Sequence, residues 1–465
     1  MVVEGVGRIR DELSKFLIDN LDVYVKILRE LVTYKSVASW SDNELSDCAN
    51  YISDILKLRG FKVTLKSGGG APVIFAEVGS GGRTVLMYNH YDVQPPDPLD
   101  LWSSNPFELV VKDDYLLGRG VADNKGNIVA RIAAIDSIIN YLDDLNLRVK
   151  FLIEGEEEVG SPTLDRVVRD SLDWVRADGG VWETAYVGSD GRLEIPLGFK
   201  GMLYIEVVLR GADRDVHSGL APLIPNPAWR LAKLLTYLKS EDGIILVPGV
   251  YEGVDPEFIH YSEELLKNLD CNELVTLRRE LGIKEFVGGL DCLEAFKGLY
   301  MKSSLNISGL YSGHVGKGVK TIVPSVAGVK IDIRLLPGQN PEYILKKFKE
   351  YLSMLGFPDA EVVIHSMYPA GYTKPNEAIV KSSVEVANEV YGKYPKVLPI
   401  SSGSGPIYLF TNIAKIPMTG AGVGYYNSRV HAPNENIRRK DFLNGMRHVA
   451  LTLIKFSSAS SSSRD

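Results

Sequence analysis

Histidines and carboxylates follow apolar runs at several points of the chain. The run at residues 84–88 is continuous, as is typical of a strand buried on both faces, and it leads into His90 and Asp92. A second run, at residues 147–153, leads into consecutive glutamates. Because open α/β sheets bind ligands at the carboxyl ends of their strands, these side chains predict a site. The candidate residues are His90, Asp92, Asp123, Glu156, Glu157, Glu158, Asp178 and His431.

Imidazole together with several carboxylates is the donor set that divalent cations such as Zn²⁺, Co²⁺ or Mn²⁺ accept. No cysteine lies near these residues in the sequence, which disfavours a structural zinc site. Taken singly, each residue has a simpler interpretation, because a strand-end His or Asp more often caps a turn and a glutamate run more often faces solvent. The order of the motifs along the chain favours the metal site.

Four motifs occur in fixed order: NHYDVQP at residues 89–95, LGRGVADNKG at 117–126, EGEEEVGS at 154–161 and HSG at 217–219. Together they closely resemble the co-catalytic metallopeptidase superfamily of aminoacylase, acetylornithine deacetylase, carnosinase and cytosolic nonspecific dipeptidase. The resemblance covers residues 44–453. Residues 91–95, with the nearby Asp97-Pro98 and Leu101-Trp102, are most similar to the dipeptidase branch.

The resemblance implies two divalent metal ions per subunit, with Zn²⁺ expected first and Co²⁺ or Mn²⁺ as alternatives. His90 and Glu158 would bind the first ion, Asp123 would bridge both, and Asp178 and His431 would complete the second. Asp92 would orient the His90 imidazole, since a ligating histidine needs its other ring nitrogen held. The resemblance also implies a cis peptide bond between Asp123 and Asn124.

Alignment with the family's motif makes Glu157 the general base and Glu158 the ligand, whereas a slip of one residue would exchange these roles. Glu183 is the alternative to Asp178. In the expected mechanism, a water shared by two cations attacks the scissile carbonyl, and Glu157 carries its proton to the leaving amine.

The resemblance further implies a homodimer in which His217 reaches the active site of the partner subunit and stabilises the oxyanion. A turn histidine is the simpler interpretation of His217. The substrate carboxylate is expected at Arg334, whose planar guanidinium can donate two parallel hydrogen bonds, and at Ser404. Thr321 and Asn306 are further candidates for the substrate pocket.

The elements that position these residues follow two patterns. Residues 1–199 and 373–465 alternate strands and helices, which predicts an α/β catalytic domain similar to zinc peptidases, with a mixed central sheet. Residues 200–372 predict helices on an antiparallel sheet, as an inserted α+β lid or dimerisation domain. The serine-rich residues 457–465 are expected to form a disordered tail.

Hydrophobic periodicity gives the elements of both parts. In the first part, helices are expected at residues 9–32, 43–58, 128–139 and 440–454, with a further one after residue 375. In the second part, strands are expected at residues 202–209, 303–310, 326–335 and 360–365, and helices at 226–238 and 341–355.

The composition of the 465 residues, 45% hydrophobic and 24% charged, is that of a globular protein of two or three domains. The net charge of −7 and the lack of a basic block exclude nucleic acid as a partner. No apolar run is long enough to span a membrane, and a cytoplasmic location is expected. The three separated cysteines exclude a disulfide framework and predict reduced, buried thiols.

The preferred function is that of a metal-dependent dipeptidase acting on small peptides. The alternatives are an N-acyl-amino-acid deacylase, similar to acetylornithine deacetylase or succinyl-diaminopimelate desuccinylase, and a carboxypeptidase. A binding protein that has lost catalysis is disfavoured, because every expected ligand and the base are present. The sequence does not specify the natural metal, the preferred dipeptide or whether longer peptides enter.

Overall fold

The chain folds into two units, each assembled from segments that are separated in sequence. The computed structural model describes residues 2–40 and 44–459. The first unit comprises Met1–Gly198, Tyr372–Leu398 and Leu409–Asp465, and the second comprises Phe199–Gly371 and Pro399–Tyr408. The predicted domain boundaries were wrong for residues 399–408. This segment belongs to the second unit because its strand β18 (Ser401–Ser404) pairs with β10 (Gly198–Arg210).

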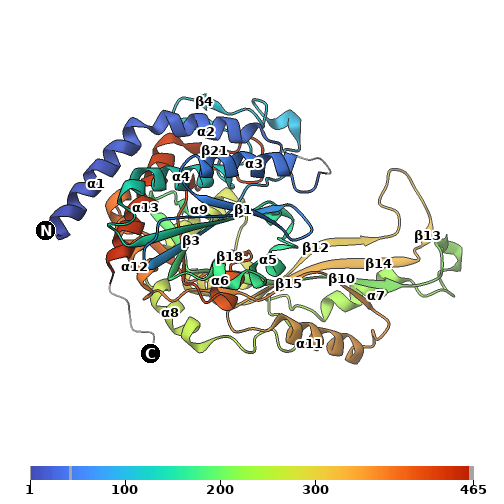
Figure 1. Ribbon diagram of the computed structural model, residues 1–465. Helices are drawn as coiled ribbons and strands as arrows, with labels where there is room; N and C mark the ends of the chain where they lie inside the picture. The colour runs from blue at the N-terminus through green and yellow to red at the C-terminus, as the bar shows by residue number, and fades with distance from the viewer. Residues whose placement is uncertain (1, 41–43, 460–465) are drawn as a thin grey trace. The chain divides into compact units, whose positions relative to one another are not determined.

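A six-stranded mixed sheet forms the centre of the first unit, as predicted (Figure 1). In spatial order its strands are β1 (Lys62–Ser67), β2 (Pro72–Val78), β6 (Leu147–Glu154), β3 (Arg83–His90), β7 (Gly179–Trp182) and β19 (Met418–Gly420). Strand β2 is antiparallel to both of its neighbours, whereas β6, β3, β7 and β19 are parallel to one another. Because β1 and β6 are both antiparallel to β2, five of the six strands run in one direction and their carboxyl ends lie at the same edge of the sheet.

Helix α4 (Lys125–Ile138) packs on β3 and is buried around almost its whole circumference, with Asp136 as its one residue that is not fully buried. Helices α2 (Leu21–Thr33) and α13 (Arg439–Ser458) pack against it. The further helices of this unit are α1 (Val2–Asp19), α3 (Glu44–Lys57), α5 (Leu164–Arg169), α6 (Leu172–Val175) and α12 (Ala378–Tyr391).

Two helical predictions for the first unit were wrong. The helix expected at residues 9–32 is interrupted at Asn20, which has a non-helical backbone conformation and whose Nδ2 donates to the carbonyl of Phe16 at 2.9 Å. This hydrogen bond satisfies a carbonyl of the last turn of α1. At the other end of the chain, α13 extends to Ser458, so the predicted tail is helical at residues 457–458. The rest of that prediction, from residue 460, lies outside the described residues.

The first unit also contains two smaller sheets. Their strands adjoin, in sequence, the loops that contain the candidate site residues. One contains β4 (Val110–Lys112), β5 (Tyr115–Leu117) and β21 (Asn436–Arg438). The other contains β8 (Tyr186–Val187), β9 (Leu193–Pro196), β17 (Lys396–Leu398) and β20 (Gly424–Tyr425). The pairing of β21 with β5 joins the chain after His431 to the chain before Asp123.

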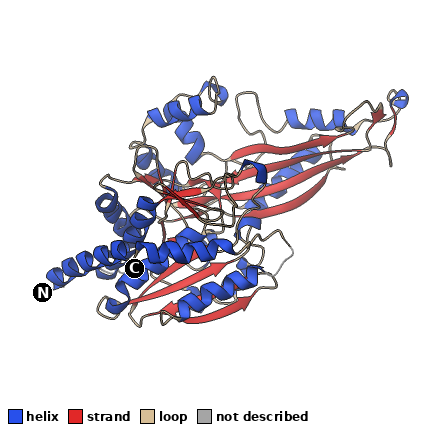
Figure 2. Cartoon of the chain, turned by 90° about the horizontal axis from the view of Figure 1, so that it is seen from above, coloured by secondary structure: helices blue, strands red, loops and turns tan. Residues whose placement is uncertain are grey.

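The second unit is built on antiparallel strands in the order β12 (Ser304–Ser312), β14 (Val326–Leu335), β10 and β15 (Glu361–Tyr368), which Figure 1 labels. Figure 2 draws the strands of the chain in red. Alternate residues of β10 and β14, such as Ile205 and Ile331, form a buried core with α7 (Pro227–Thr236) and α11 (Pro341–Met354). The residues between them lie on the opposite face of the sheet, and Glu206, Lys330 and Asp332 are polar members of that face. A short two-stranded sheet contains β11 (Val216–His217) and β13 (Ile322–Val323), and β16 (Gly371–Tyr372) pairs with β10.

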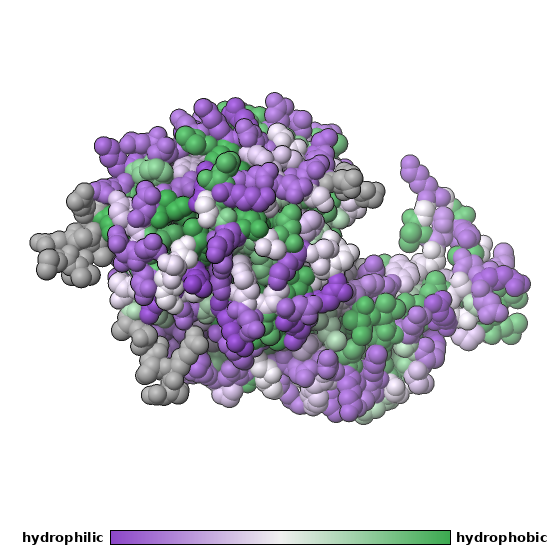
Figure 3. Space-filling view, in the orientation of Figure 1, coloured by the Kyte–Doolittle hydropathy of each residue, from purple (hydrophilic) through white to green (hydrophobic). Residues whose placement is uncertain are grey.

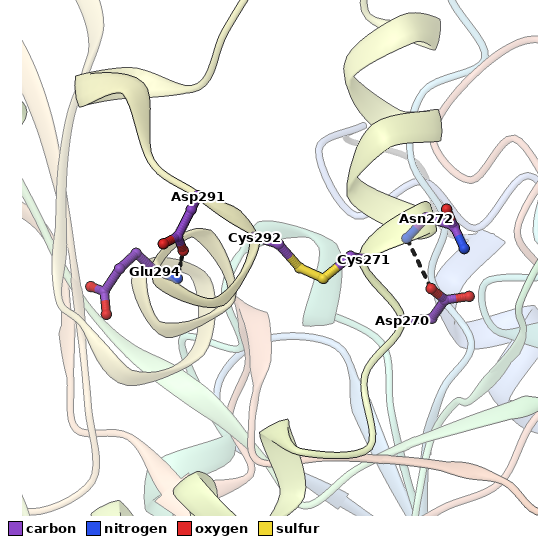
Figure 4. Close-up of a disulfide and its surroundings, with 6 residues drawn as sticks. All are labelled: Asp270, Cys271, Asn272, Asp291, Cys292 and Glu294. Carbon is purple, nitrogen blue, oxygen red and sulfur yellow. Dashed lines mark hydrogen bonds between the residues drawn. A yellow bond between two sulfur atoms is a disulfide. The ribbon is translucent and has the colours of Figure 1, made fainter.

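Three further helices of the second unit were not predicted: α8 (Pro256–Leu266), α9 (Cys271–Glu280) and α10 (Cys292–Met301). Each begins after an aspartate whose side chain accepts a backbone N–H of the first turn, as Figure 4 shows for Asp270 and Asp291. The prediction of reduced thiols holds for Cys48, which is free and buried. It was wrong for Cys271 and Cys292, which form a disulfide with a Cα–Cα distance of 5.6 Å (Figure 4). Each of these cysteines is the first residue of its helix, and the packing of α9 against α10 brings the two together.

No helix in the described ranges is both long enough and apolar enough to cross a membrane. Polar and apolar residues are interspersed over the face drawn in Figure 3. The cytoplasmic location stays a prediction.

Candidate active site

The candidate residues of the first unit gather at the edge where the parallel strands end. His90 is the last residue of β3, and Glu154, the last residue of β6, pairs with it in register. Glu157 and Glu158 follow β6 in a short 3₁₀ turn. Glu183 directly follows β7, the neighbour of β3 on its other side. The sheet topology therefore delivers one imidazole and several carboxylates to the same place.

His90 is completely buried and is held from both sides of its ring. Its Nδ1 lies 3.2 Å from the backbone oxygen of Asp92 and 3.3 Å from Oδ1 of the same residue. The Asp92 carboxylate also accepts the backbone N–H groups of Glu157 at 3.2 Å and Glu158 at 2.9 Å. Asp92 thus connects the histidine at the end of β3 to the glutamates that follow β6.

Asp123 lies between two histidines. His90 Nε2 is 3.0 Å from its Oδ1, and His431 Nε2 is 3.2 Å from its Oδ2. Burial alone would raise the pKa of the Asp123 carboxyl, but the hydrogen bonds from His431 and His90 outweigh it and hold that pKa below its ordinary value. The peptide bond from Asp123 to Asn124 is cis, as the resemblance implied.

Each histidine also has a carboxylate of its own. His431 Nε2 lies 3.2 Å from Glu158 Oε2, and His90 Nε2 lies 3.7 Å from Glu183 Oε2. His431 is about half exposed, and its contacts with Asp123 and Glu158 raise its pKa to about 10. The prediction joined Glu158 to His90 at one ion, and His90, Asp123 and Glu158 do offer three ligand atoms within 4.8 Å of one another.

Glu157 is partly buried, and the surroundings of its carboxylate differ from those of Glu156 and Glu158. Burial, and then the negative charge of Glu183, raise the pKa of the Glu157 carboxyl well above its ordinary value. Glu156 turns away, because its carboxylate accepts a hydrogen bond from the hydroxyl of Thr163. The three glutamates of the run therefore face three different environments.

Asp178, predicted as a ligand, does not reach this cluster. It precedes β7, and its Oδ2 accepts the backbone N–H of Thr84 at 2.9 Å, at the start of β3. Thr84 and His90 are six residues apart on one strand, which separates them by about 20 Å at ~3.3 Å per residue. Asp178 is therefore at the amino edge of the sheet, and Glu183, the alternative, is at the carboxyl edge.

The predicted residues of the second unit fall into two groups. In the first group, Arg334 Nη1 donates to Ser404 Oγ at 2.7 Å, and Asn306 Nδ2 donates to Asp332 Oδ2 at 2.9 Å. Arg334 Nε lies 3.5 Å from the other oxygen of this carboxylate, Asp332 Oδ1. His217 is exposed, and its Nδ1 accepts the backbone N–H of Gly219 at 3.0 Å.

Thr321 belongs to the group of His217, because its carbonyl accepts the N–H of Ser218 at 3.1 Å. Lys200, which was not predicted, is almost fully buried near Arg334. Burial lowers the pKa of Lys200 to about 8.

Residues 86–455 match the peptidase family M20/M25/M40. The chain belongs to this family. It is 27% identical over 402 residues to the Beta-Ala-His dipeptidase of Mus musculus, covering 83% of this chain and 80% of that protein. It is 26% identical over 407 residues to the Cys-Gly metallodipeptidase of Saccharomyces cerevisiae, covering 83% of this chain and 82% of that one.

Two solved structures of the family are also similar. An M20 family metallo-carboxypeptidase from Sulfolobus solfataricus is 35% identical, with a TM-score of 0.87, covering 93% of this chain and 99% of the other. Human carnosine dipeptidase 1 is 26% identical, with a TM-score of 0.79, covering 97% of this chain and 100% of the other. Like these M20 metallopeptidases, the chain combines helices with mixed sheets.

The side chains of the M20 site fit a divalent cation. His90, Asp123 and Glu158 each offer a ligand atom, and these three atoms lie within 4.8 Å of one another. Among the described residues, Glu158 Oε1 and Glu183 Oε2 are buried oxygens without a hydrogen-bond partner. A buried carboxylate oxygen without a donor is costly, and a cation removes that cost. The donor set of imidazoles and carboxylates suits Zn²⁺, Co²⁺ or Mn²⁺.

Several residues that support this M20 site were missed by the sequence analysis. Gln94 Nε2 donates to Glu158 Oε2 at 2.9 Å and so orients that carboxylate. Glu154 is buried and accepts hydroxyl hydrogen bonds from Tyr88 at 2.6 Å and Ser161 at 2.8 Å. Burial raises the pKa of Glu154 to about 8. Gln94 and Glu154 lie inside the quoted motifs, so their positions in the sequence were the available signal.

Proposed function

We propose that this protein is a metal-dependent dipeptidase. The observation that carries the proposal is the position of Asp123, one oxygen of which faces His90 and the other His431, with a further carboxylate beside each histidine. This symmetric arrangement suits two cations that share one carboxylate. The Beta-Ala-His and Cys-Gly dipeptidase relatives support dipeptides as the substrate class.

In this proposal, His90 and Glu183 would hold one divalent ion, His431 and Glu158 would hold the other, and Asp123 would contribute to both. Zn²⁺ is the preferred ion, with Co²⁺ or Mn²⁺ as alternatives. The bound ions would supply Lewis acidity for the scissile carbonyl and lower the pKa of water toward neutrality. Asp92 keeps the His90 ring in the orientation that presents Nε2 to the site.

Glu157 is proposed as the general base. Its backbone is fixed by Asp92, while its carboxylate is adjacent to the charges of Glu183 and Glu158. A carboxylate that belongs to neither ligand set can accept a proton from water and then return it to the leaving amine. Glu157 therefore moves the proton between water and the amide nitrogen of the substrate.

Arg334 and Ser404 are proposed to bind the substrate carboxylate. Their side chains are hydrogen-bonded to each other, so both polar groups are already oriented together. Thr321 and Asn306 remain proposed members of the substrate pocket, and the hydrogen bond of Asn306 to Asp332 fixes its amide.

The homodimer, and the donation of His217 to the partner's site, rest on the sequence motif and on its resemblance. The second unit would then act as the lid and dimerisation domain. The exposed His217 ring keeps its Nε2 available, because the contact to Gly219 uses Nδ1. Mixing inactive His217→Ala subunits with inactive Glu157→Gln subunits would restore activity if the site is shared, and would restore none, after verified exchange, if it is not.

The substrate proposal is tested with protein stripped of metal by chelation. A panel of dipeptides, N-acetyl and N-succinyl amino acids and an N-blocked tripeptide is assayed before and after addition of Zn²⁺, Co²⁺ or Mn²⁺. We expect metal-restored hydrolysis of dipeptides. Cleavage of only the N-acyl amino acids would make the protein a deacylase, and release of the last residue from the blocked tripeptide would make it a carboxypeptidase, like the Sulfolobus relative.

A further inference from the structure

A buried ion pair, Arg119 with Glu435, lies next to Asp123. Both side chains are 1% exposed, and Arg119 Nη1 is 2.9 Å from Glu435 Oε2. That oxygen also accepts the N–H of Gly120 at 3.0 Å, while Oε1 accepts the N–H groups of Ala122 at 2.9 Å and Asp123 at 3.1 Å. Each oxygen of Glu435 therefore has two donors, and one of the four belongs to the proposed bridging residue.

The same pair reaches the loop that follows β3. Arg119 Nη2 donates to the carbonyl of Pro95 at 3.1 Å, and the guanidinium lies 5.3 Å from the ring centroid of Trp102. Pro95 is in the loop that begins at His90, and Glu435 is in the loop that contains His431. One ion pair thus connects the three loops that carry His90, Asp123 and His431.

Stability alone is a poor explanation for this arrangement. A buried ion pair loses much of its Coulombic gain to desolvation, and an apolar pair of the same volume often stabilises a fold as well. An apolar pair could not accept the three backbone N–H groups or reach the Pro95 carbonyl. The specific advantage of Arg119 and Glu435 is that they fix the spacing between loops.

We propose that the Arg119–Glu435 pair is a positioning unit that holds Asp123 between His90 and His431 before metal binds. It parallels Asp92, which holds His90 and the glutamate turn. Neither Arg119 nor Glu435 contacts the substrate or the cation in this proposal. The inference rests on the proposed metal site.

The test is the Zn²⁺ affinity of Glu435→Gln, measured by competition with a chelating dye. An amide nitrogen in place of one oxygen faces two N–H donors, so the loop of Asp123 must shift. Loss of a partner that orients ligands typically costs 10–100-fold in metal affinity, and we expect an apparent Kd raised by about that factor. At saturating Zn²⁺, kcat should stay within about threefold of the wild type, since the base and all ligands remain.

The matched control is Asp136→Asn, which breaks another largely buried ion pair of the same unit, with Arg59 at 2.8 Å. It should lower thermal stability without changing the Kd for Zn²⁺. An unchanged Kd in Glu435→Gln, with a loss of stability equal to that of the control, overturns the inference. Should Glu435→Gln fail to fold, Arg119→Lys replaces it, because lysine keeps the charge but cannot reach Glu435 and Pro95 together. A wild-type protein that binds no divalent ion would instead overturn the proposed function.

Discussion

Two histidine–carboxylate contacts of nearly equal length lie in the two units. His90 Nε2 is 3.0 Å from Asp123, and His365 Nε2 is 2.8 Å from Glu206 on the polar face of the second unit's sheet. The His90 side chain is 0% exposed and the His365 side chain is 36% exposed. The length of the contact therefore does not distinguish a site from a surface pair.

The surroundings of the two contacts do distinguish them. Glu206 has its charge compensated by hydrogen bonds from Tyr311 and His365, which lower the pKa of its carboxyl. Beside His90, hydrogen bonds also lower the pKa of Asp123, but at Glu183 burial outweighs the nearby imidazole and raises the pKa to about 8. A concentration of buried carboxylates with too few donors is the property that marks the candidate active site.

Among the variants, Glu157→Gln should have the largest effect on kcat. An unchanged kcat would contradict the assignment of Glu157 as the base. The amide cannot accept a proton, so kcat should fall by about 10²–10⁴-fold, while metal content stays near that of the wild type. Steady-state kinetics on a cleaved dipeptide, together with metal analysis by mass spectrometry, measures both quantities. Glu206→Gln in the second unit is the control and should leave kcat unchanged.

The effects of Glu157→Gln and Glu158→Gln on metal content also test which of the two residues is the base and which is the ligand. If Glu157→Gln lost a metal ion and Glu158→Gln kept both ions and lost only kcat, the roles of the two residues would be exchanged.

The two acidic residues that flank β7, Asp178 and Glu183, should differ in their effect on metal binding. Glu183→Gln should raise the Kd for one of the two proposed ions by at least the ~10–100-fold lost with a partner that only orients a ligand, whereas Asp178→Asn should leave both Kd values unchanged. The reason is position, because Glu183 Oε2 faces His90 and Asp178 accepts the N–H of Thr84 at the other edge. Equilibrium dialysis of the two variants against Zn²⁺ measures the difference. Loss of metal in Asp178→Asn with full retention in Glu183→Gln would contradict the assignment.

A third histidine predicts how the stability of the fold depends on pH. His448 is fully buried, its Nε2 donates to the carbonyl of Ser383 at 3.0 Å, and burial lowers its pKa to about 4. The folded protein disfavours the protonated ring, so protonation of His448 lowers the free energy of unfolding. This free energy is highest above the unfolded pKa of about 6.5 and decreases as pH falls toward 4. At pH 5 the loss is about 2 kcal/mol, by the usual conversion of pKa differences.

Urea unfolding at pH 7 and pH 5 measures this effect. His448→Gln should remove most of the difference between the two pH values, whereas His365→Gln, at the exposed pair, should keep it. A difference that persists unchanged in His448→Gln would assign the acid sensitivity to other groups.

Much of the site could be predicted from sequence, because His90, Asp123, Glu157 and Glu158 directly follow apolar strands or belong to long motifs. The choice of Asp178 over Glu183 failed for a physical reason. The two residues flank a strand of four residues, so sequence proximity did not separate them, and only the direction of β7 in the sheet places Glu183 at the carboxyl edge. The rule applied to β3 and β6 would have selected Glu183.

The second unit was less predictable where its contacts are distant in sequence. The alternation of β10 and β14 gave their strands, but nothing local indicates that residues 399–408 return to pair with β10. The Cys271–Cys292 disulfide depends on the packing of α9 against α10, which were not predicted. The aspartates before these helices were the local signal that was available.

The late position of His431 in the chain has a consequence for biosynthesis. Glu183 leaves the ribosome about 250 residues before His431, a delay of roughly 12–50 s at about 5–20 residues per second. During that time the nascent chain contains His90, Asp123 and Glu183 but lacks His431 and also Glu435. The two proposed ion sites can therefore be complete only on a chain that has been synthesised beyond His431, so translation products truncated before that residue would be excluded from full metal loading.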